Sequence, residues 1–312
     1  MVEVKPAPMA NVRDKTAFIT GGANGIGLGI ARALVRAGAN VVIADIRDSS
    51  LAEAKASLGA DDQVETVQLD VTDRDGFARA ADAAEARFGK IHMLIGNAGV
   101  GVLGPVLDAR YADWDWGLGV NLMGVVNGLV TILPRIRAHG EGGQMVTTSS
   151  QSALIPIPGS AIYTATKAAV LGMSEAIRGE LAPENIGVSV FLPGPVQSNI
   201  AMSSEVRPEK LRQDSGYVEF EEGMKKRPVS PLWMSADEVG ERVLAGIRNN
   251  DLYILTHPEF KEGTRTRFEA ILASYPEEPI NEARAKEIAF LLGNPAFDEQ
   301  LARRTRVTEA AD

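Results

Sequence analysis

The sequence predicts an α/β protein with a doubly wound parallel sheet, formed as a single domain with a lid insertion and a helical C-terminal extension. Short apolar runs alternate with longer amphipathic stretches from Lys15 onward, which is the pattern of βαβ units. The apolar runs are almost continuous, as expected for strands that helices cover on both faces. Sites in such sheets lie at the carboxyl ends of the strands.

The elements follow in order along the chain. The expected strands are Thr16–Thr20, Asn40–Ala44, Val64–Leu69, Ile91–Ile95, Gln144–Thr148, Val188–Leu192 and Leu252–Thr256. The expected helices are Gly25–Ala37, Arg74–Phe88, Tyr111–Arg137, Tyr163–Leu181, Ala236–Arg248 and, within a mostly helical end segment, Glu282–Leu292.

The domain boundaries follow from these patterns. Residues 1–14 form an N-terminal tail, 15–257 the main domain and 258–312 a C-terminal extension. Residues 199–231 lack clear periodicity and are too long for an ordinary connection, so they are expected to form a lid. Large apolar residues in and just after it either close an apolar pocket or pack the lid onto the domain: Met202, Tyr217, Phe220, Met224 and Trp233.

Composition excludes several functions. The net charge of −9 argues against nucleic-acid binding, and the absence of cysteine removes thiolate chemistry. His92, His139 and His257 are far apart in sequence, so no metal site is expected. No uninterrupted apolar run reaches about 18 residues, so no membrane span is expected. We therefore expect a cytoplasmic protein.

A glycine-rich turn follows the first strand and opens the first helix. Glycine permits the tight turn and close approach of the backbone to a pyrophosphate, and the helix N-terminus attracts the phosphates. Such a cluster alone is weak evidence for a dinucleotide. The candidate contacts in it are Gly21, Asn24, Gly25, Ile26 and Gly27.

Asp45 ends the second expected strand, 18 residues after Gly27. A carboxylate at this place accepts hydrogen bonds from the adenosine ribose and repels a 2′-phosphate, so NAD is favoured over NADP. The alternative is a polar strand end without that role. Arg47, two residues on, is a potential partner for a 2′-phosphate.

Tyr163 and Lys167 are four residues apart and share one face of an expected helix. A free phenol is a poor base at neutral pH, and a neighbouring ammonium together with a nicotinamide charge is expected to lower its pKa. Ser150, at the end of a strand 13 residues earlier, supplies a hydroxyl to hold the same substrate oxygen. The tyrosine–lysine pair alone is common by chance, and its weight comes from the other two motifs.

Residues 15–200 resemble the short-chain dehydrogenase/reductase family, whose fold is of the Rossmann type. The family's glycine motif matches Thr20–Gly27, and its catalytic serine, tyrosine and lysine match Ser150, Tyr163 and Lys167. The resemblance implies that Tyr163 and Lys167 also bind the cofactor, in the acid/base and ribose-binding roles. Val120-Asn121-Leu122 matches the segment whose asparagine binds a water of the proton relay. The resemblance also implies a homodimer or homotetramer.

The same resemblance implies further cofactor contacts. Asp70 and Val71 match the pair that meets the adenine ring, the second through its backbone. The implied contacts in the family's Asn-Ala-Gly motif and Pro-Gly loop are Asn97, Ala98, Gly99, Pro193, Gly194, Val196 and Ser198. Gly96 and His92 depart from the family pattern, and we interpret His92 as a surface variation.

Beyond Ser198 a looser resemblance links the chain to bacterial members such as the Cα-dehydrogenases of lignin-derived aryl ethers. It implies a bulky, aromatic (benzylic) secondary alcohol or ketone as the small-molecule substrate. The alternatives are a steroid or alicyclic alcohol and a β-ketoacyl-type compound. An NAD-binding regulatory protein without activity is the non-enzyme alternative, although such proteins usually lose the tyrosine or lysine, and both are present here.

Overall fold

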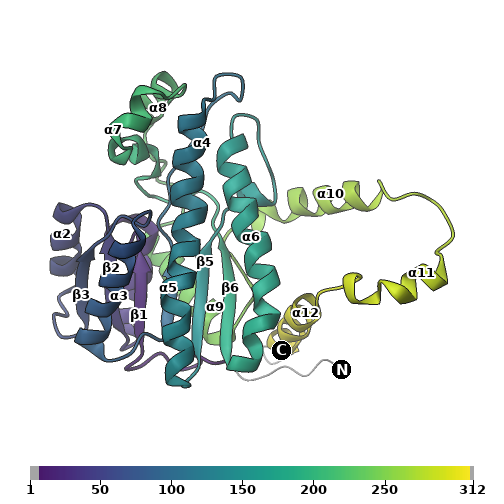
Figure 1. Ribbon diagram of the computed structural model, residues 1–312, viewed down its shortest axis with the longest axis horizontal. Helices are drawn as coiled ribbons and strands as arrows, with labels where there is room; N and C mark the ends of the chain where they lie inside the picture. Colours follow the sequence, from purple (N-terminus) through teal and green to yellow (C-terminus); the bar gives the residue numbers. More distant parts are fainter. Residues whose placement is uncertain (1–6, 310–312) are drawn as a thin grey trace.

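The computed structural model describes the backbone of residues 7–309 and the side chains of residues 7–303. Seven parallel strands form one sheet in the order β3-β2-β1-β4-β5-β6-β7 (Figure 1). They span Thr16–Thr20 (β1), Asn40–Asp45 (β2), Val64–Gln68 (β3), Met93–Gly96 (β4), Gly143–Thr148 (β5), Ile186–Leu192 (β6) and Tyr253–Leu255 (β7). The order reverses between β1 and β4, so the predicted doubly wound fold is confirmed.

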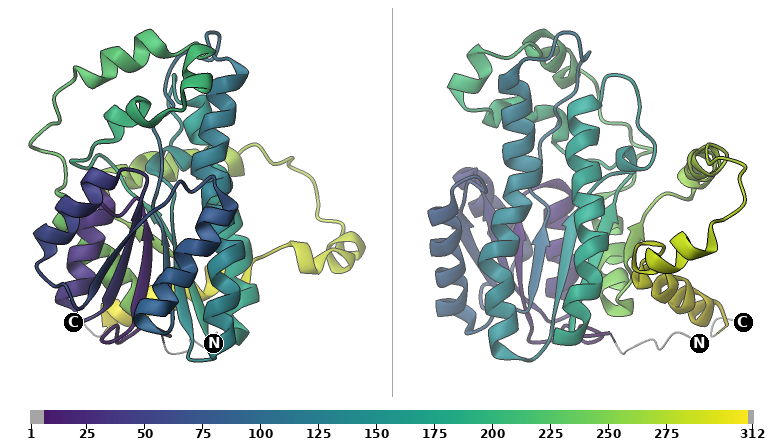
Figure 2. Two further views of the ribbon diagram at one scale, coloured as in Figure 1. Left: turned by 60° about the vertical axis from the view of Figure 1, so that its left-hand side comes forward. Right: turned by 45° about the vertical axis from the view of Figure 1, so that its right-hand side comes forward.

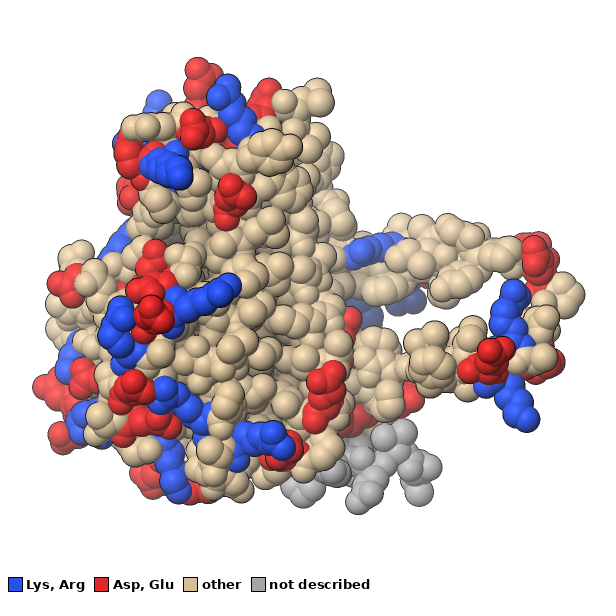
Figure 3. Space-filling view, viewed as in Figure 1, with Lys and Arg blue, Asp and Glu red and all other residues tan. Residues whose placement is uncertain are grey.

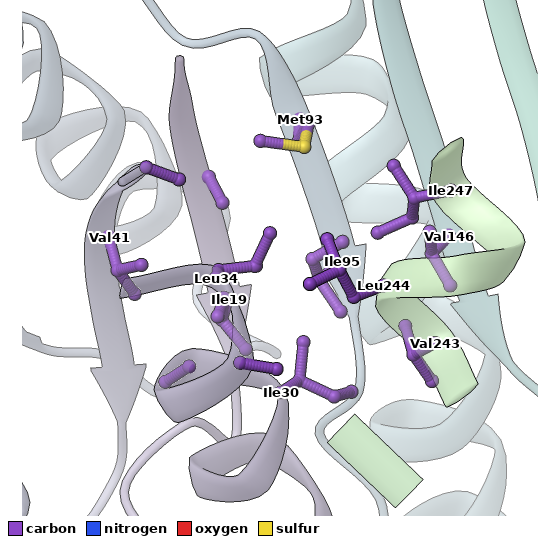
Figure 4. Close-up of a cluster of buried hydrophobic side chains, with 14 of the residues drawn as sticks. Ile19, Ile30, Leu34, Val41, Met93, Ile95, Val146, Val243, Leu244 and Ile247 are labelled. Carbon is purple, nitrogen blue, oxygen red and sulfur yellow. The ribbon is translucent and has the colours of Figure 1, made fainter. Parts of the chain in front are cut away.

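Helices cover the two faces of the sheet. One layer contains α1 (Gly25–Arg36), α2 (Asp48–Leu58) and α9 (Ala236–Asn249), and the other contains α3 (Arg74–Phe88), α5 (Gly124–His139) and α6 (Ala161–Leu181). Figure 4 shows Ile30 and Leu34 of α1 and Leu244 of α9 facing β1 and β4. The segment assigned to an N-terminal tail contributes Met9 and Val12 to this core.

The sequence prediction missed α2, whose pattern is weak because only Leu51 and Ala54 are buried. The helix expected over Tyr111–Arg137 is interrupted. It consists of α4 (Tyr111–Leu118), one π-helical segment η1 (Gly119–Met123) and α5. This whole stretch, Tyr111–His139, is long and apolar enough to cross a membrane by length and composition. Here α5 instead packs on β4 and α3 as a layer of the domain.

The predicted lid contains short helical segments, η4 (Ile200–Val206), α7 (Glu209–Gln213) and α8 (Val218–Lys225), which lie over the end of α4 (Figure 2). The C-terminal extension has α10 (Lys261–Leu272), α11 (Glu282–Glu287) and α12 (Pro295–Glu309). α10 and α11 form an arm that stands away from the domain, whereas α12 returns to α6 (Figures 1 and 2).

Candidate active site

The glycine turn between β1 and α1 is packed so closely that side chains are excluded. Gly21 has φ +61°, and a Cβ there would lie 2.8 Å from Cα of Ala98. A Cβ on Gly27 would lie 2.1 Å from the Gly21 carbonyl oxygen. Asn97 reinforces the turn, because its Nδ2 donates to the carbonyls of Thr20 (3.2 Å) and Gly21 (3.0 Å). Asn97 therefore holds the turn in shape.

A cavity of about 420 Å³ opens beside this turn. The predicted cofactor residues that line it are Gly21, Asn24, Gly25, Ile26, Asp45, Asp70, Val71, Asn97, Ala98, Gly99 and Ser198. The first turn of α1 carries no acidic residue, and its residues Gly25 and Ile26 line the cavity. These features fit the phosphates of a dinucleotide.

The two predicted nucleotide-binding carboxylates are fixed by backbone groups. Asp45 accepts hydrogen bonds from the backbone N–H of Ala23 (Oδ2, 3.1 Å) and of Arg47 (Oδ1, 3.2 Å). Asp70 Oδ1 accepts from the backbone N–H (2.9 Å) and hydroxyl (2.8 Å) of Thr72. Asp45 thus ties the end of β2 to the glycine turn as well as lining the cavity.

Ser150, at the end of β5, faces the tyrosine as predicted. Its Oγ accepts from the backbone N–H of Ser152 at 3.1 Å, which leaves its own proton for Tyr163, to which it is hydrogen-bonded. Ser149 points the other way, and its buried hydroxyl donates to the Lys167 carbonyl at 2.7 Å.

Lys167 is buried behind Tyr163. Its Nζ lies 5.7 Å from the centroid of the Tyr163 ring and donates to the Thr148 carbonyl at 2.8 Å. Burial lowers the pKa of Lys167 to about 8. A Cβ on Gly99 would lie 3.3 Å from this Nζ, so the lysine and the cavity meet at Gly99.

The expected lowering of the Tyr163 pKa depends on the lysine ammonium together with a nicotinamide charge, and in the protein alone this pKa is raised. Burial raises it, and only the hydrogen bond with Ser150 acts the other way. Burial thus favours the protonated form of the phenol in the free protein.

Asn121 lies in the π-helical segment, and its side chain connects neighbouring elements. Oδ1 accepts from the Val100 N–H at 2.7 Å, while Nδ2 donates to the Val100 carbonyl (3.0 Å) and to Thr166 Oγ1 (3.2 Å). These bonds fix the loop after β4 against α6. The side chain thereby positions Gly99 and the lysine helix.

Six predicted cofactor contacts do not line the cavity: Gly27, Tyr163, Lys167, Pro193, Gly194 and Val196. Val196 is buried in the core and bridges to Met234, so its side chain faces away from the cavity. The Pro193 carbonyl accepts from the Gln151 N–H at 3.0 Å. The catalytic candidates Asn121, Ser150, Tyr163 and Lys167 also lie outside the lining, and Asn121 Oδ1 and Lys167 Nζ border Gly99, which belongs to it.

A buried ionic cluster that the sequence prediction missed anchors the lid. Arg207 pairs with Asp113 of α4 at 2.7 Å and with Glu221 of α8 at 2.5 Å, and its guanidinium lies 4.1 Å from the Trp116 ring centroid. Asp113 also accepts from the Ser215 hydroxyl. Because Asp113 and Arg207 are 94 residues apart, no local pattern relates them.

His92 is buried, so its interpretation as a surface variation is wrong. Its Nδ1 accepts from the Thr16 N–H (3.1 Å) and its Nε2 contacts Glu141 (3.1 Å). His139, distant in sequence, lies beside it. Its Nε2 is hydrogen-bonded to the Ile91 carbonyl, and its Nδ1 accepts from the backbone N–H of Glu141. The ligand atoms of these two histidines and Glu141 lie close enough for a metal, but each ring nitrogen already has a partner.

Three comparisons place this site among known proteins. A family model described as short chain dehydrogenase matches residues 15–209. A C alpha-dehydrogenase from Sphingobium sp. is 40% identical over 288 residues, covering 91% of this chain and 94% of the relative. A short chain dehydrogenase/reductase from Burkholderia phymatum in complex with NAD has a TM-score of 0.79 at 32% identity, and the match covers 87% of this chain and 99% of that chain. The apo form of LigD from Sphingobium sp. has a TM-score of 0.72 at 34% identity, and the match covers 85% of this chain and 99% of LigD.

Proposed function

The chain belongs to the short-chain dehydrogenase family of oxidoreductases, and from this premise we propose that it transfers a hydride between NAD and a bulky secondary alcohol or ketone. The observation that carries the proposal is that Ser150 is hydrogen-bonded to Tyr163, that Lys167 Nζ lies 5.7 Å from the Tyr163 ring centroid, and that this Nζ borders Gly99 of the cavity lining.

The three side chains have separate tasks. The Tyr163 phenol gives its proton to the carbonyl oxygen of a ketone, or takes the proton from an alcohol in the reverse direction. Ser150 donates a hydrogen bond to the same oxygen and polarises the carbonyl. The Lys167 ammonium holds the ribose and favours the phenolate, while the bound nicotinamide supplies or accepts the hydride. Because burial raises the Tyr163 pKa, the phenol of the free protein is suited to donate a proton. Oxidation of an alcohol needs the phenolate instead, so it needs further positive charge near the phenol to lower this pKa.

Asp45 supports NAD over NADP, since its carboxylate is fixed at the end of β2 within the cavity lining. The solved relative from Burkholderia phymatum was obtained with NAD. We also propose the cytoplasm as the compartment, where the pool of this cofactor is available; cell fractionation tests this directly.

The substrate class rests on the lid and on the relatives. Apolar lid residues Ile200, Val206 and Leu211 line the cavity together with Trp116, and such walls favour a hydrophobic ligand. The C alpha-dehydrogenase relative supports a benzylic carbinol as the first class to test. A panel of aryl carbinols, steroids, alicyclic alcohols and β-hydroxyacyl thioesters with NAD separates the candidates. Absence of turnover on all four, with NAD bound, would favour the regulatory alternative.

We further propose a homo-oligomer. The face formed by α4, α5 and α6 is almost free of charged side chains in Figure 3, and Tyr111 and Val130 are 91% and 64% exposed. The arm adds exposed apolar residues such as Leu272, Tyr275 and Phe290. A second copy covering these faces removes them from water. Light scattering that gives the mass of a monomer at micromolar concentration would contradict this.

A further inference from the structure

We propose that Glu205 of the lid is a second residue that discriminates against NADP, because it pairs with Arg47, the cation two residues after Asp45. The inference rests on the proposed use of NAD. It assigns to the lid a role in choosing the cofactor, in addition to its role over the substrate.

The geometry joins the lid to the end of β2. Asp45 and Arg47 line the cavity, and the Arg47 backbone N–H is held by the Asp45 carboxylate. The Arg47 guanidinium turns to the lid, where its Nη2 lies 3.4 Å from Glu205 Oε2. Glu205 belongs to η4, and its neighbours Ser203 and Val206 line the same cavity. The lid thus reaches across to the nucleotide half of the site.

The charges around this position disfavour a 2′-phosphate. Asp45, Arg47 and Glu205 together carry a net charge of −1, whereas Asp45 and Arg47 without Glu205 would balance. A phosphate group binds arginine strongly through paired hydrogen bonds, so an unoccupied Arg47 would offset the repulsion by Asp45. Because Glu205 pairs with Arg47, a 2′-phosphate must displace one carboxylate while it approaches another.

The side chains of Arg47 and Glu205 are 29% and 45% exposed, so their pairing is weak enough to yield to a stronger anion. The discrimination by Glu205 is therefore expected to be modest alone and larger when Asp45 is also removed. Arg47 must be present for the gain that comes from removing Glu205, whereas removing Asp45 also relieves its own repulsion of a 2′-phosphate.

The test measures the dissociation constants of NADH and NADPH for the full chain by calorimetry. The variants are Asp45→Ala, Glu205→Gln, the double variant, and the double variant with Arg47→Ala. We expect Glu205→Gln to improve NADPH binding relative to NADH about threefold to fivefold. The double variant should improve it on the order of a hundredfold, and adding Arg47→Ala should abolish most of that gain.

Glu209→Gln is the matched control, because it removes the same unit charge from the lid at an exposed pair with Arg212. It is expected to leave the ratio of the two constants unchanged. An equal shift in Glu205→Gln and Glu209→Gln, or a double-variant gain that survives Arg47→Ala undiminished, would overturn the inference. Failure of the wild type to bind either dinucleotide would instead overturn the proposed function itself.

Discussion

Replacing Arg207 by methionine tests whether the buried cluster holds the lid. The Arg207 side chain is fully buried, pairs with Asp113 and Glu221, and covers the Trp116 ring. Arg207→Met keeps much of the apolar stem against the ring and removes the charge. The two carboxylates then face each other with no cation between them.

The size of the effect follows from burial. Breaking a buried ion pair by removing one partner costs about 3–5 kcal/mol, because the other charge stays unpaired. Here two carboxylates lose their partner, and burial already raises the pKa of Glu221. Undocking the lid exposes both to water and relieves part of the cost. If the lid stays docked in Arg207→Met, we expect a loss of roughly 3 kcal/mol in the free energy of unfolding. If the lid undocks, we expect faster hydrogen exchange of the amides of residues 200–227 and a raised KM.

Thermal unfolding and amide hydrogen exchange measure the two outcomes. Arg212→Met is the matched control, since Arg212 pairs with Glu209 at the surface and is expected to change stability by less than about 0.5 kcal/mol. Adding Asp113→Asn and Glu221→Gln to Arg207→Met should recover part of the loss. If Arg207→Met matches the wild type in stability, exchange and KM, the cluster does not anchor the lid.

Three further predictions concern the glycine turn, the lysine and the base of the sheet. Gly27→Ala places a methyl group 2.1 Å from the Gly21 carbonyl, so NADH binding should weaken more than about tenfold by calorimetry. The pKa of Lys167 is about 8, so its ammonium is present below that pH and lost above it. The rate of ketone reduction should therefore fall as the pH rises through about 8. In Lys167→Arg the positive charge persists, so this fall in rate should disappear. Burial lowers the pKa of His92 below 6.5, so its contribution to stability is complete above 6.5 and is lost as the pH falls below it. His92→Asn should therefore show a smaller fall in melting temperature than the wild type between about pH 7.5 and 5.5, and an equal fall would contradict the assignment.

Local patterns predict the parts of this protein that depend on neighbouring residues. The turn from Thr20 to Gly27 is determined by backbone space within one βα unit, and the face shared by Tyr163 and Lys167 by helical spacing. The strands β1, β2, β4, β5 and β6 were found because most of their residues are buried on both faces of the sheet, whereas β3 and β7 are only partly buried and were found from their place in the alternating pattern.

The remainder depends on contacts between distant segments, which spacing cannot reveal. The Arg207 cluster and the His92–His139 contact unite residues from separate elements. The direction of the Tyr163 pKa in the free protein depends on the burial of the phenol, which helical spacing does not reveal. The helix α2 escaped prediction because few of its residues are buried.

The most direct test of the central claim compares Tyr163→Phe with the wild type in NADH binding and in single-turnover ketone reduction. We expect the variant to bind NADH and to reduce the ketone at least about a hundredfold more slowly, because it lacks the proton donor. Tyr253→Phe, whose lost hydroxyl donates to Glu175 at 2.6 Å, is the matched control and should react at the wild-type rate. Full turnover in Tyr163→Phe would contradict the role assigned to this phenol.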